Sequence, residues 1–243
     1  MSKNYGLNKY QENYYSQYGE DGMIKECLES LNINENGYFV DVGSWDGIYL
    51  SNVYHLIKDK NFSGICIEAD KNKFDQLTNN MSSFNVKCLN SFISIEEDNC
   101  IDYLLEQNNC PINFDLISID IDGNDWWIWN SLNKYRPKIV VIEYNSNIQK
   151  SCIMPYDKNY VHHNTIYYGA TPPALELLGK FKNYDLVGIN GVNMFFISKE
   201  FNNLPIVSTN QYPWFMKWAS NDSREMLEIN DIEDIIEINN AKN

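Results

Sequence analysis

The sequence is poor in basic residues: 19 Lys and Arg stand against 33 Asp and Glu in 243 residues, so the formal net charge is -14. Proteins that bind nucleic acids cluster Lys and Arg against the phosphates. This balance therefore argues against a nucleic-acid substrate and against an anionic membrane surface. No apolar run approaches the roughly 18 residues of a membrane span, and residues 1–5 form no apolar signal region. We expect a cytoplasmic protein with a small-molecule substrate.

The six cysteines include no C-x-x-C pair. This spacing argues against a zinc site or a disulfide framework and favours reduced thiols. The length and the hydrophobic content of 44% suit one globular domain with a full core. We predict a single domain over residues 1–243, with an arm at 1–15, a core at 16–205 and a tail at 206–243. A homodimer is compatible with the sequence, which does not fix the oligomeric state.

Short apolar runs alternate with helical patterns along the chain. The runs are continuous and rich in β-branched residues, as expected for strands that are buried on both faces. We predict strands at 38–42, 64–68, 86–89, 114–120 and 138–143, and helices at 16–31, 51–58, after Asp70, 101–107 and 172–180. Two late strands, 184–189 and 192–197, flank Asn190-Gly191, which is a hairpin turn signal. The pattern predicts an α/β fold with a doubly wound, mostly parallel seven-stranded sheet and an antiparallel C-terminal hairpin.

The turn after the first strand has few glycines. Only Gly43 and Gly47 are present, so the G-x-G-x-x-G fingerprint of a dinucleotide site is missing. Asp41 precedes this turn, and Glu68 ends the next strand, where an acid can accept both hydroxyls of a ribose. An acidic, glycine-poor turn favours S-adenosylmethionine, which has an amino acid tail in place of a pyrophosphate.

Several polar and aromatic residues stand near the expected strand ends and could contact such a cofactor. Gln17 and Tyr18 would contact its methionine part. Phe92 would lie near the adenine, although a place in the core explains it equally well. An ordinary turn with helix caps is the alternative reading, and Asp70 is better explained as a cap. The full set of predicted cofactor-binding residues is Gln17, Tyr18, Asp41, Gly43, Ser44, Asp46, Glu68, Ala69, Ser91, Phe92 and Asp120.

Acidic and amide side chains gather after the fourth and fifth predicted strands. Asp120, Glu143 and Asn145 offer hard oxygen ligands suited to Mg²⁺ or Mn²⁺. Without a metal, Asp122 or Asp120 could act as a general base. Turn acids and helix caps are the alternative explanation for this cluster.

The long polar segment after the fifth strand contains two adjacent histidines. It could fold over the mouth of the site, and His163 is then our candidate for a base or a metal ligand, although a histidine pair is more often structural. Asn190 and Asn193 lie around the predicted hairpin turn. They could contribute to the site or could serve only as turn residues.

Taken together, the motifs resemble those of the FkbM-like family of S-adenosylmethionine-dependent methyltransferases. The resembling segments are residues 16–21, 39–47, 67–70, 117–125 and 141–143, with weaker similarity at 168–170 and 188–196. The resemblance implies that Gly43, Ser44 and Asp46 line the cofactor and that Glu68 binds its ribose. The chain departs from the family pattern at residues 119–125, which contain more acids.

The family commonly methylates hydroxyls of sugars and other natural products. The resemblance therefore implies O-methylation of a sugar or a phosphorylated small-molecule precursor in surface-polysaccharide (capsule) biosynthesis. Two other functions stay open from the residues alone: a nicotinamide-dependent oxidoreductase and a non-catalytic cofactor-binding module.

Overall fold

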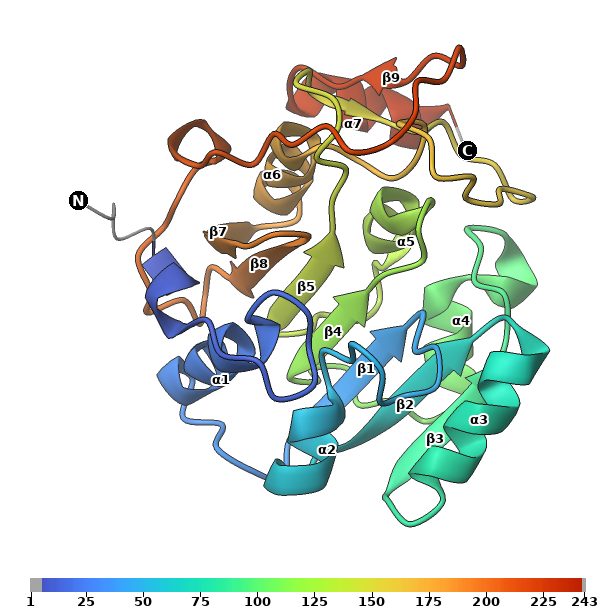
Figure 1. The fold of residues 1–243 in the computed structure, drawn as a ribbon, viewed down its shortest axis with the longest axis vertical. Helices are drawn as coiled ribbons and strands as arrows, with labels where there is room; N and C mark the ends of the chain where they lie inside the picture. The colour runs from blue at the N-terminus through green and yellow to red at the C-terminus, as the bar shows by residue number, and fades with distance from the viewer. Residues whose placement is uncertain (1–5, 242–243) are drawn as a thin grey trace.

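A seven-stranded sheet forms the centre of the protein in a computed structural model that describes residues 6–241 (Figure 1). The strand order is β3-β2-β1-β4-β5-β8-β7. The first five strands are parallel, and β8 is antiparallel to both β5 and β7. The predicted doubly wound, mostly parallel sheet with an antiparallel hairpin is confirmed. The strands are β1 Tyr38–Val42, β2 Ser63–Glu68, β3 Val86–Asn90, β4 Leu116–Ile119, β5 Ile139–Glu143, β7 Tyr184–Ile189 and β8 Asn193–Ser198.

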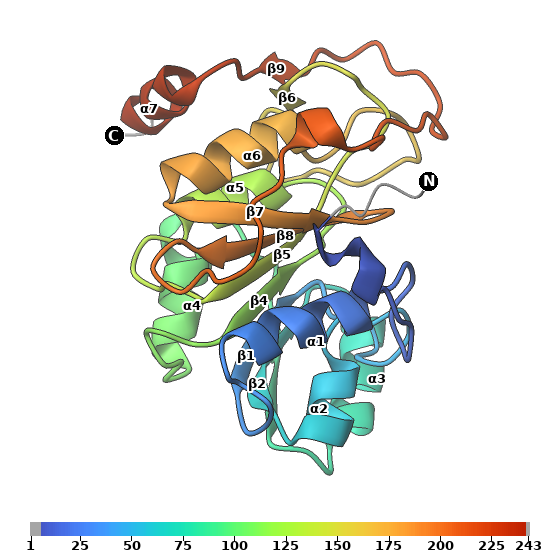
Figure 2. The same cartoon turned by 90° about the vertical axis from the view of Figure 1, so that its left-hand side faces the viewer.

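Helices cover both faces of this sheet (Figure 2). One face packs against α1, α2 and α3, and the other against α4, α5 and α6, so that two apolar cores form. The helices are α1 Glu20–Ser30, α2 Tyr54–Lys60, α3 Lys71–Met81, α4 Ile101–Gln107, α5 Asp125–Ser131 and α6 Pro172–Phe181.

Side chains of the central strands alternate between the two cores. In β5, Ile139 and Val141 face the α1–α3 side, while Val140 and Ile142 face the α4–α6 side. All four are fully buried. The continuous apolar runs of the sequence are the direct consequence of this two-sided burial.

The first helix begins later than the sequence pattern suggests. The predicted start was Ser16, but α1 begins at Glu20, after Gly19 in the left-handed region. Ser16 instead exchanges hydrogen bonds with Asp21: its N–H and hydroxyl both donate to Asp21 Oδ2 at 2.8 Å. The predicted cap at Asp70 is confirmed, because its Oδ1 accepts from Asn72 N and Lys73 N.

The C-terminal segment folds back over the polar stretch that follows β5. Strand β9 (Leu227–Glu228) pairs antiparallel with β6 (Cys152–Ile153), and α7 (Ile232–Asn240) lies beside α6 (Figure 1). Ile166 N–H donates to Ser220 O at 2.8 Å, and Ser220 N–H donates to Asn164 O at 3.2 Å. The tail therefore holds residues 164–166 in place.

Short 3-10 helices complete the described chain at Gly6–Tyr10, Glu97–Asn99 and Thr209–Gln211. The first of them buries Leu7 within the predicted arm. The outer ends of the predicted arm and tail, residues 1–5 and 242–243, lie outside the described residues. All six cysteines are free thiols. Within residues 6–241, every helix is too short or too polar to cross a membrane.

Candidate functional site

Two adjoining cavities open at the carboxyl ends of the parallel strands. The first, about 340 Å³, lies over β1, β2 and β4, and the second, about 240 Å³, lies over β1, β4 and β5. They share Gly43, Trp45, Asp120 and Asp122 as lining residues. Ligands of open α/β sheets bind at this edge, so the pair of cavities forms the candidate site. We call them the nucleoside cavity and the acidic cavity.

Gly43 brings the β1 turn into contact with the end of β4. Its φ is +88°, and a Cβ atom at this position would lie 1.7 Å from the carbonyl oxygen of Asp120. A larger residue is therefore excluded both by the backbone conformation and by space. The missing side chain lets the β1 turn approach the end of β4 closely, and the backbone of Gly43 lines both cavities.

Glu68 is held rigidly at the end of β2. Its Oε2 accepts from Trp45 N–H at 2.8 Å, and its Oε1 accepts from Asp70 N–H at 2.7 Å. Each oxygen keeps a second acceptor position, and the side chain lines the nucleoside cavity. The predicted residues Ala69, Ser91 and Phe92 line the same cavity. This arrangement suits a ribose with two hydroxyls beside a planar base.

Asp41 lies beneath the acidic cavity in a nearly dry position. Burial raises the pKa of its carboxyl to about 6, although hydrogen bonds from Ser44 and Ser118 oppose this rise and the nearby Glu68 adds to it. Ser44 also accepts from Ile67 N–H and donates to the Asp41 carbonyl. Asp41 and Ser44 are thus brought to the site as predicted, with Ser118 as an additional neighbour.

The loop before α1 is organised around two adjacent carboxylates. Asp21 Oδ2 accepts from the N–H groups of residues 14–16, and Glu20 Oε2 accepts from those of Gln17 and Tyr18. Gln17 thereby lines the acidic cavity, and its contact with a cofactor stays a prediction. Tyr18 is not among the lining residues of either cavity; its ring covers Gly191 instead.

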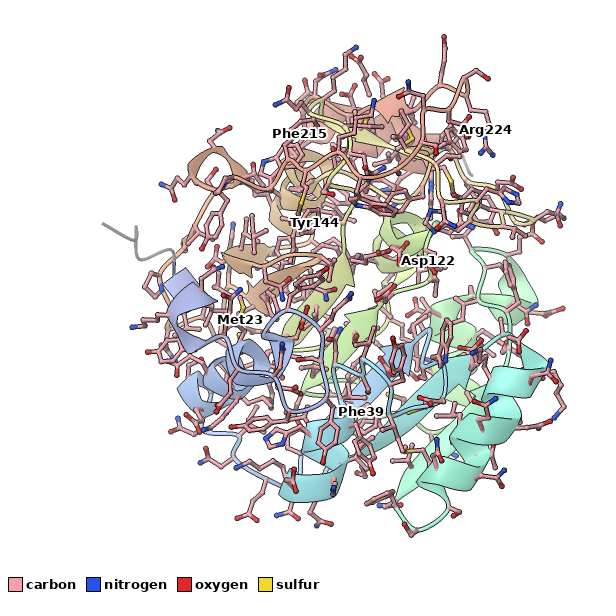
Figure 3. All side chains as sticks on the ribbon, in the orientation of Figure 1. Met23, Phe39, Asp122, Tyr144, Phe215 and Arg224 are labelled. Atoms are coloured by element: carbon pink, nitrogen blue, oxygen red, sulfur yellow. The ribbon has the colours of Figure 1, made fainter. Side chains whose placement is uncertain are left out.

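Three carboxylates converge above β4 and β5. One oxygen each from Asp120, Asp122 and Glu143 lie within 4.8 Å of one another. Burial and the neighbouring acids raise the pKa values of Asp120 and Glu143 well above their usual range. Asp122 stands at the mouth, in the loop from β4 to α5, with a side chain that is 59% exposed (Figure 3). The acidic residues that were predicted to gather after β4 and β5 therefore do lie close together.

Asn145 does not join these carboxylates, which corrects the predicted metal-ligand set. Its side chain is fully buried, and its amide donates to the carbonyls of Ile166 and Tyr168. Its Oδ1 accepts from Asn147 N–H at 2.9 Å. Because β5 ends at Glu143, Asn145 already belongs to the loop and is used to hold it.

The histidine that approaches the acids is His162, not the predicted His163. His162 Nδ1 lies 3.3 Å from Asp122 Oδ1, and its ring stacks on Tyr168 with centroids 4.8 Å apart. His163 is exposed.

Asp46 serves the turn and does not line either cavity, in contrast to its predicted cofactor contact. Its Oδ1 accepts from Ile48 N–H and Tyr49 N–H. This pair of bonds fixes the turn that presents Trp45 and Tyr49 to the acidic cavity. The contacts of Asp46 are therefore those of a capping residue, which was the alternative explanation for it.

Several lining residues were given no definite role in the site from the sequence, where Asn193 was interpreted as a possible turn residue. Asn193 lies opposite Glu143 in the β5–β8 pairing and lines the acidic cavity. The hairpin signal at Asn190-Gly191 could have located it, had the register of the pairing been known. Trp45, Lys73 and Tyr160 line the nucleoside cavity, with Lys73 Nζ 3.5 Å from the centre of the Trp45 ring. No local motif marks Lys73 or Tyr160, and Trp45 lies within the motif at residues 39–47 but was not predicted to line the site.

Known proteins were compared with the chain both by sequence and by structure. No protein-family model and no curated protein matches the sequence. Similar solved structures include a SAM-dependent methyltransferase from Aquifex aeolicus, with 13% identity, a TM-score of 0.43 and coverage of 79% of this chain and 96% of that chain. TrmK from M. capricolum, in complex with S-adenosyl-homocysteine, has 12% identity, a TM-score of 0.39 and coverage of 82% of this chain and 71% of that chain.

A precorrin-6y C5,15-methyltransferase from Geobacter metallireducens has 14% identity, a TM-score of 0.35 and coverage of 55% of this chain and 65% of that chain. The fold itself is defined by the sheet described above. Its strand order and its antiparallel last pair are those of the Rossmann-like class I methyltransferase fold, as predicted.

Proposed function

We propose that the protein is an S-adenosylmethionine-dependent methyltransferase that acts on a hydroxyl group. The observation that carries this proposal is the junction of the two cavities at Gly43. A rigid acid for a ribose lies on one side, and a cluster of carboxylates lies on the other. When bound, S-adenosylmethionine supplies an electrophilic methyl carbon to an oxygen placed in line with its sulfonium.

The residues present fit this cofactor. Glu68 can accept the ribose hydroxyls, and Phe92 offers an exposed ring for the adenine. Gln17, at the opposite end, can bind the amino acid tail, and the acids around Asp41 favour the positive charge of the ammonium and sulfonium groups. No third glycine is needed, because the tail contains no pyrophosphate.

Asp122 is the residue best placed to take the proton of an acceptor hydroxyl. It lines both cavities, and its exposed carboxylate contacts His162, which orients it. Holding donor and acceptor in line supplies much of the rate of such transfers. Removing the proton then contributes about 10²- to 10⁴-fold.

The acceptor we propose is a sugar or a phosphorylated precursor in surface-polysaccharide biosynthesis, in line with the FkbM-like motifs. The acidic cavity is lined by Glu20, Asp41, Asp120, Asp122 and Glu143 and by no Lys or Arg of the described chain. This charge supports entry of the uncharged sugar end, because a phosphate would be repelled. Any phosphate of the acceptor would remain outside.

Thermal unfolding tests the cofactor. S-adenosylmethionine or S-adenosylhomocysteine at about 100 times its dissociation constant should raise the free energy of unfolding by roughly 2.7 kcal/mol, whereas NAD should not. A shift with NAD alone would favour the oxidoreductase. Methyl transfer from labelled S-adenosylmethionine to a panel of sugars, sugar phosphates and nucleotide sugars tests the acceptor. Tight cofactor binding with no transfer to any hydroxyl compound would favour the non-catalytic module.

A further inference from the structure

The acidic cavity concentrates negative charge without an internal counter-charge. Asp120, Asp122 and Glu143 approach one another within 4.8 Å, and the cationic side chains of the described chain do not line this cavity. Crowded carboxylates cannot all remain ionised at such separations unless a cation joins them. An acidic cluster can also simply take up protons, so a further observation has to distinguish the two explanations.

Asn193 supplies that observation. It is 2% exposed and lines the same cavity, directly across from Glu143 in the β5–β8 register. Its Nδ2 donates to Glu20 Oε1 at 3.2 Å, which fixes the orientation of the amide. The amide oxygen is therefore turned away from Glu20, and it has no hydrogen-bond partner among residues 6–241. A buried carbonyl oxygen without a donor is costly, and a cation would satisfy it.

The protein holds this amide oxygen in place through a chain of contacts. Glu20 is itself fixed by the N–H groups of Gln17 and Tyr18. Asn193 N–H donates to Asn190 Oδ1 at 2.7 Å within the hairpin turn. The oxygen is thus positioned by two elements that meet only in the folded state, as is common for groups that support a bound ion.

We propose that Asp120, Asp122 and Glu143, together with the amide oxygen of Asn193, form a binding site for a divalent cation of the Mg²⁺ or Mn²⁺ type. All four donors are oxygens, which is the ligand chemistry of these ions. Two oxygens that share an ion at about 2.1 Å lie at most about 4.2 Å apart. The exposed side chain of Asp122 can close the remaining difference by a small rotation.

This site replaces the set predicted from sequence, in which Asn145 was a ligand. Its use in catalysis rests on the proposed function: the ion would hold the acceptor hydroxyl and make it more acidic. Three or four protein oxygens leave two or three positions of an octahedron open. The acceptor class that fits is therefore a compound with two adjacent oxygens, such as a sugar diol.

Ion binding can be measured without cofactor or acceptor. We would titrate the full chain with Mn²⁺ and follow the free ion by electron paramagnetic resonance, with Mg²⁺ as a competitor. The expected result is one Mn²⁺ per chain that Mg²⁺ displaces. Glu143→Gln and Asp122→Asn should each weaken binding at least about tenfold, and Asn193→Ala by a smaller factor. Asp75→Asn, an exposed acid of α3, is the matched control and should change nothing.

Several outcomes would overturn the site. The wild-type chain could fail to bind Mn²⁺ saturably, or Asp122→Asn could bind it as well as the wild type does. Unchanged affinity in Asn193→Ala would remove the amide oxygen and the four-ligand set with it. Asp122 is exposed, so its variant should fold even if that of the half-buried Glu143 does not. A thermal shift with S-adenosylhomocysteine in the absence of Mn²⁺ separates failure of this site from failure of the proposed function.

Discussion

The two cavities share a wall but differ in how they treat charge. In the nucleoside cavity, the Glu68 carboxylate is satisfied by two backbone N–H groups, and Lys73 lies close by over Trp45. In the acidic cavity, carboxylates face one another and an amide oxygen has no donor among the described residues. In the first cavity, each oxygen of the Glu68 carboxylate therefore has a hydrogen-bond donor within the described chain. In the second cavity, the negative charge of the carboxylates is not compensated by a cationic side chain of the described chain. A proton or a bound cation would reduce their mutual repulsion.

The largest expected effect separates chemistry from cofactor binding. Asp122→Asn should lower turnover about 10²- to 10⁴-fold, because both proton removal and ion binding depend on its charge. Its affinity for S-adenosylhomocysteine should stay within about a factor of two, since Glu68 and the Gly43 turn are untouched. Methyl-transfer kinetics and calorimetric titration measure the two quantities. Full activity in this variant would remove Asp122 from the mechanism.

The next effect concerns the stability of the empty protein. Folding raises the pKa of Asp41 from 3.8 to about 6, so the folded state loses stability as pH rises through this interval and does not regain it above. Asp41→Asn removes this penalty and should raise the free energy of unfolding by up to about 3 kcal/mol at pH 8. The gain should vanish near pH 4.

Urea unfolding of Asp41→Asn and the wild type at the two pH values, without ligands, measures this gain. An equal gain at both would show that packing, and not charge, is responsible.

The smallest expected effect is on cofactor affinity and tests the role of Glu68 in the nucleoside cavity. Glu68→Ala should weaken S-adenosylhomocysteine binding about ten- to a hundredfold, because it removes charged hydrogen bonds of about 1.5–3 kcal/mol to the ribose. Mn²⁺ affinity should be unchanged, in contrast to Glu143→Gln. If Glu68→Ala weakened both ligands alike, the two cavities would not be separate sites. Thermal unfolding of the unliganded variant controls for the loss of the Trp45 contact.

The sequence predicted the parts of this protein that depend on short-range patterns. Continuous apolar runs located the central strands β1, β2, β4 and β5, which are buried on both faces. The Asn190-Gly191 turn signal helped to locate the hairpin strands β7 and β8, and the edge strand β3 was located although it has no fully buried residue. The parallel arrangement then placed acids from β4 and β5 at one edge. Asp70 as a helix cap likewise follows from local chemistry.

Residues whose position depends on pairing between distant segments could not be predicted. Asn193 faces Glu143 only because β8 returns antiparallel in one particular register. His162 reaches Asp122 through a loop whose path is set by the tail, some sixty residues further along. Asn145 was misplaced for the opposite reason: it is close to Glu143 in sequence, but the strand has ended and the backbone has turned.

The clasp between the tail and the loop after β5 has a consequence for local unfolding of the protein. Residues 164–166 are held by Ser220, and Asn147 Oδ1 accepts from Trp218 N–H and Ala219 N–H. All of these contacts join residues that follow β8 to the loop that follows β5. The sheet does not use them, whereas the position of His162 beside Asp122 depends on them. Local opening of the clasp would therefore separate His162 from Asp122 while the main sheet stays folded.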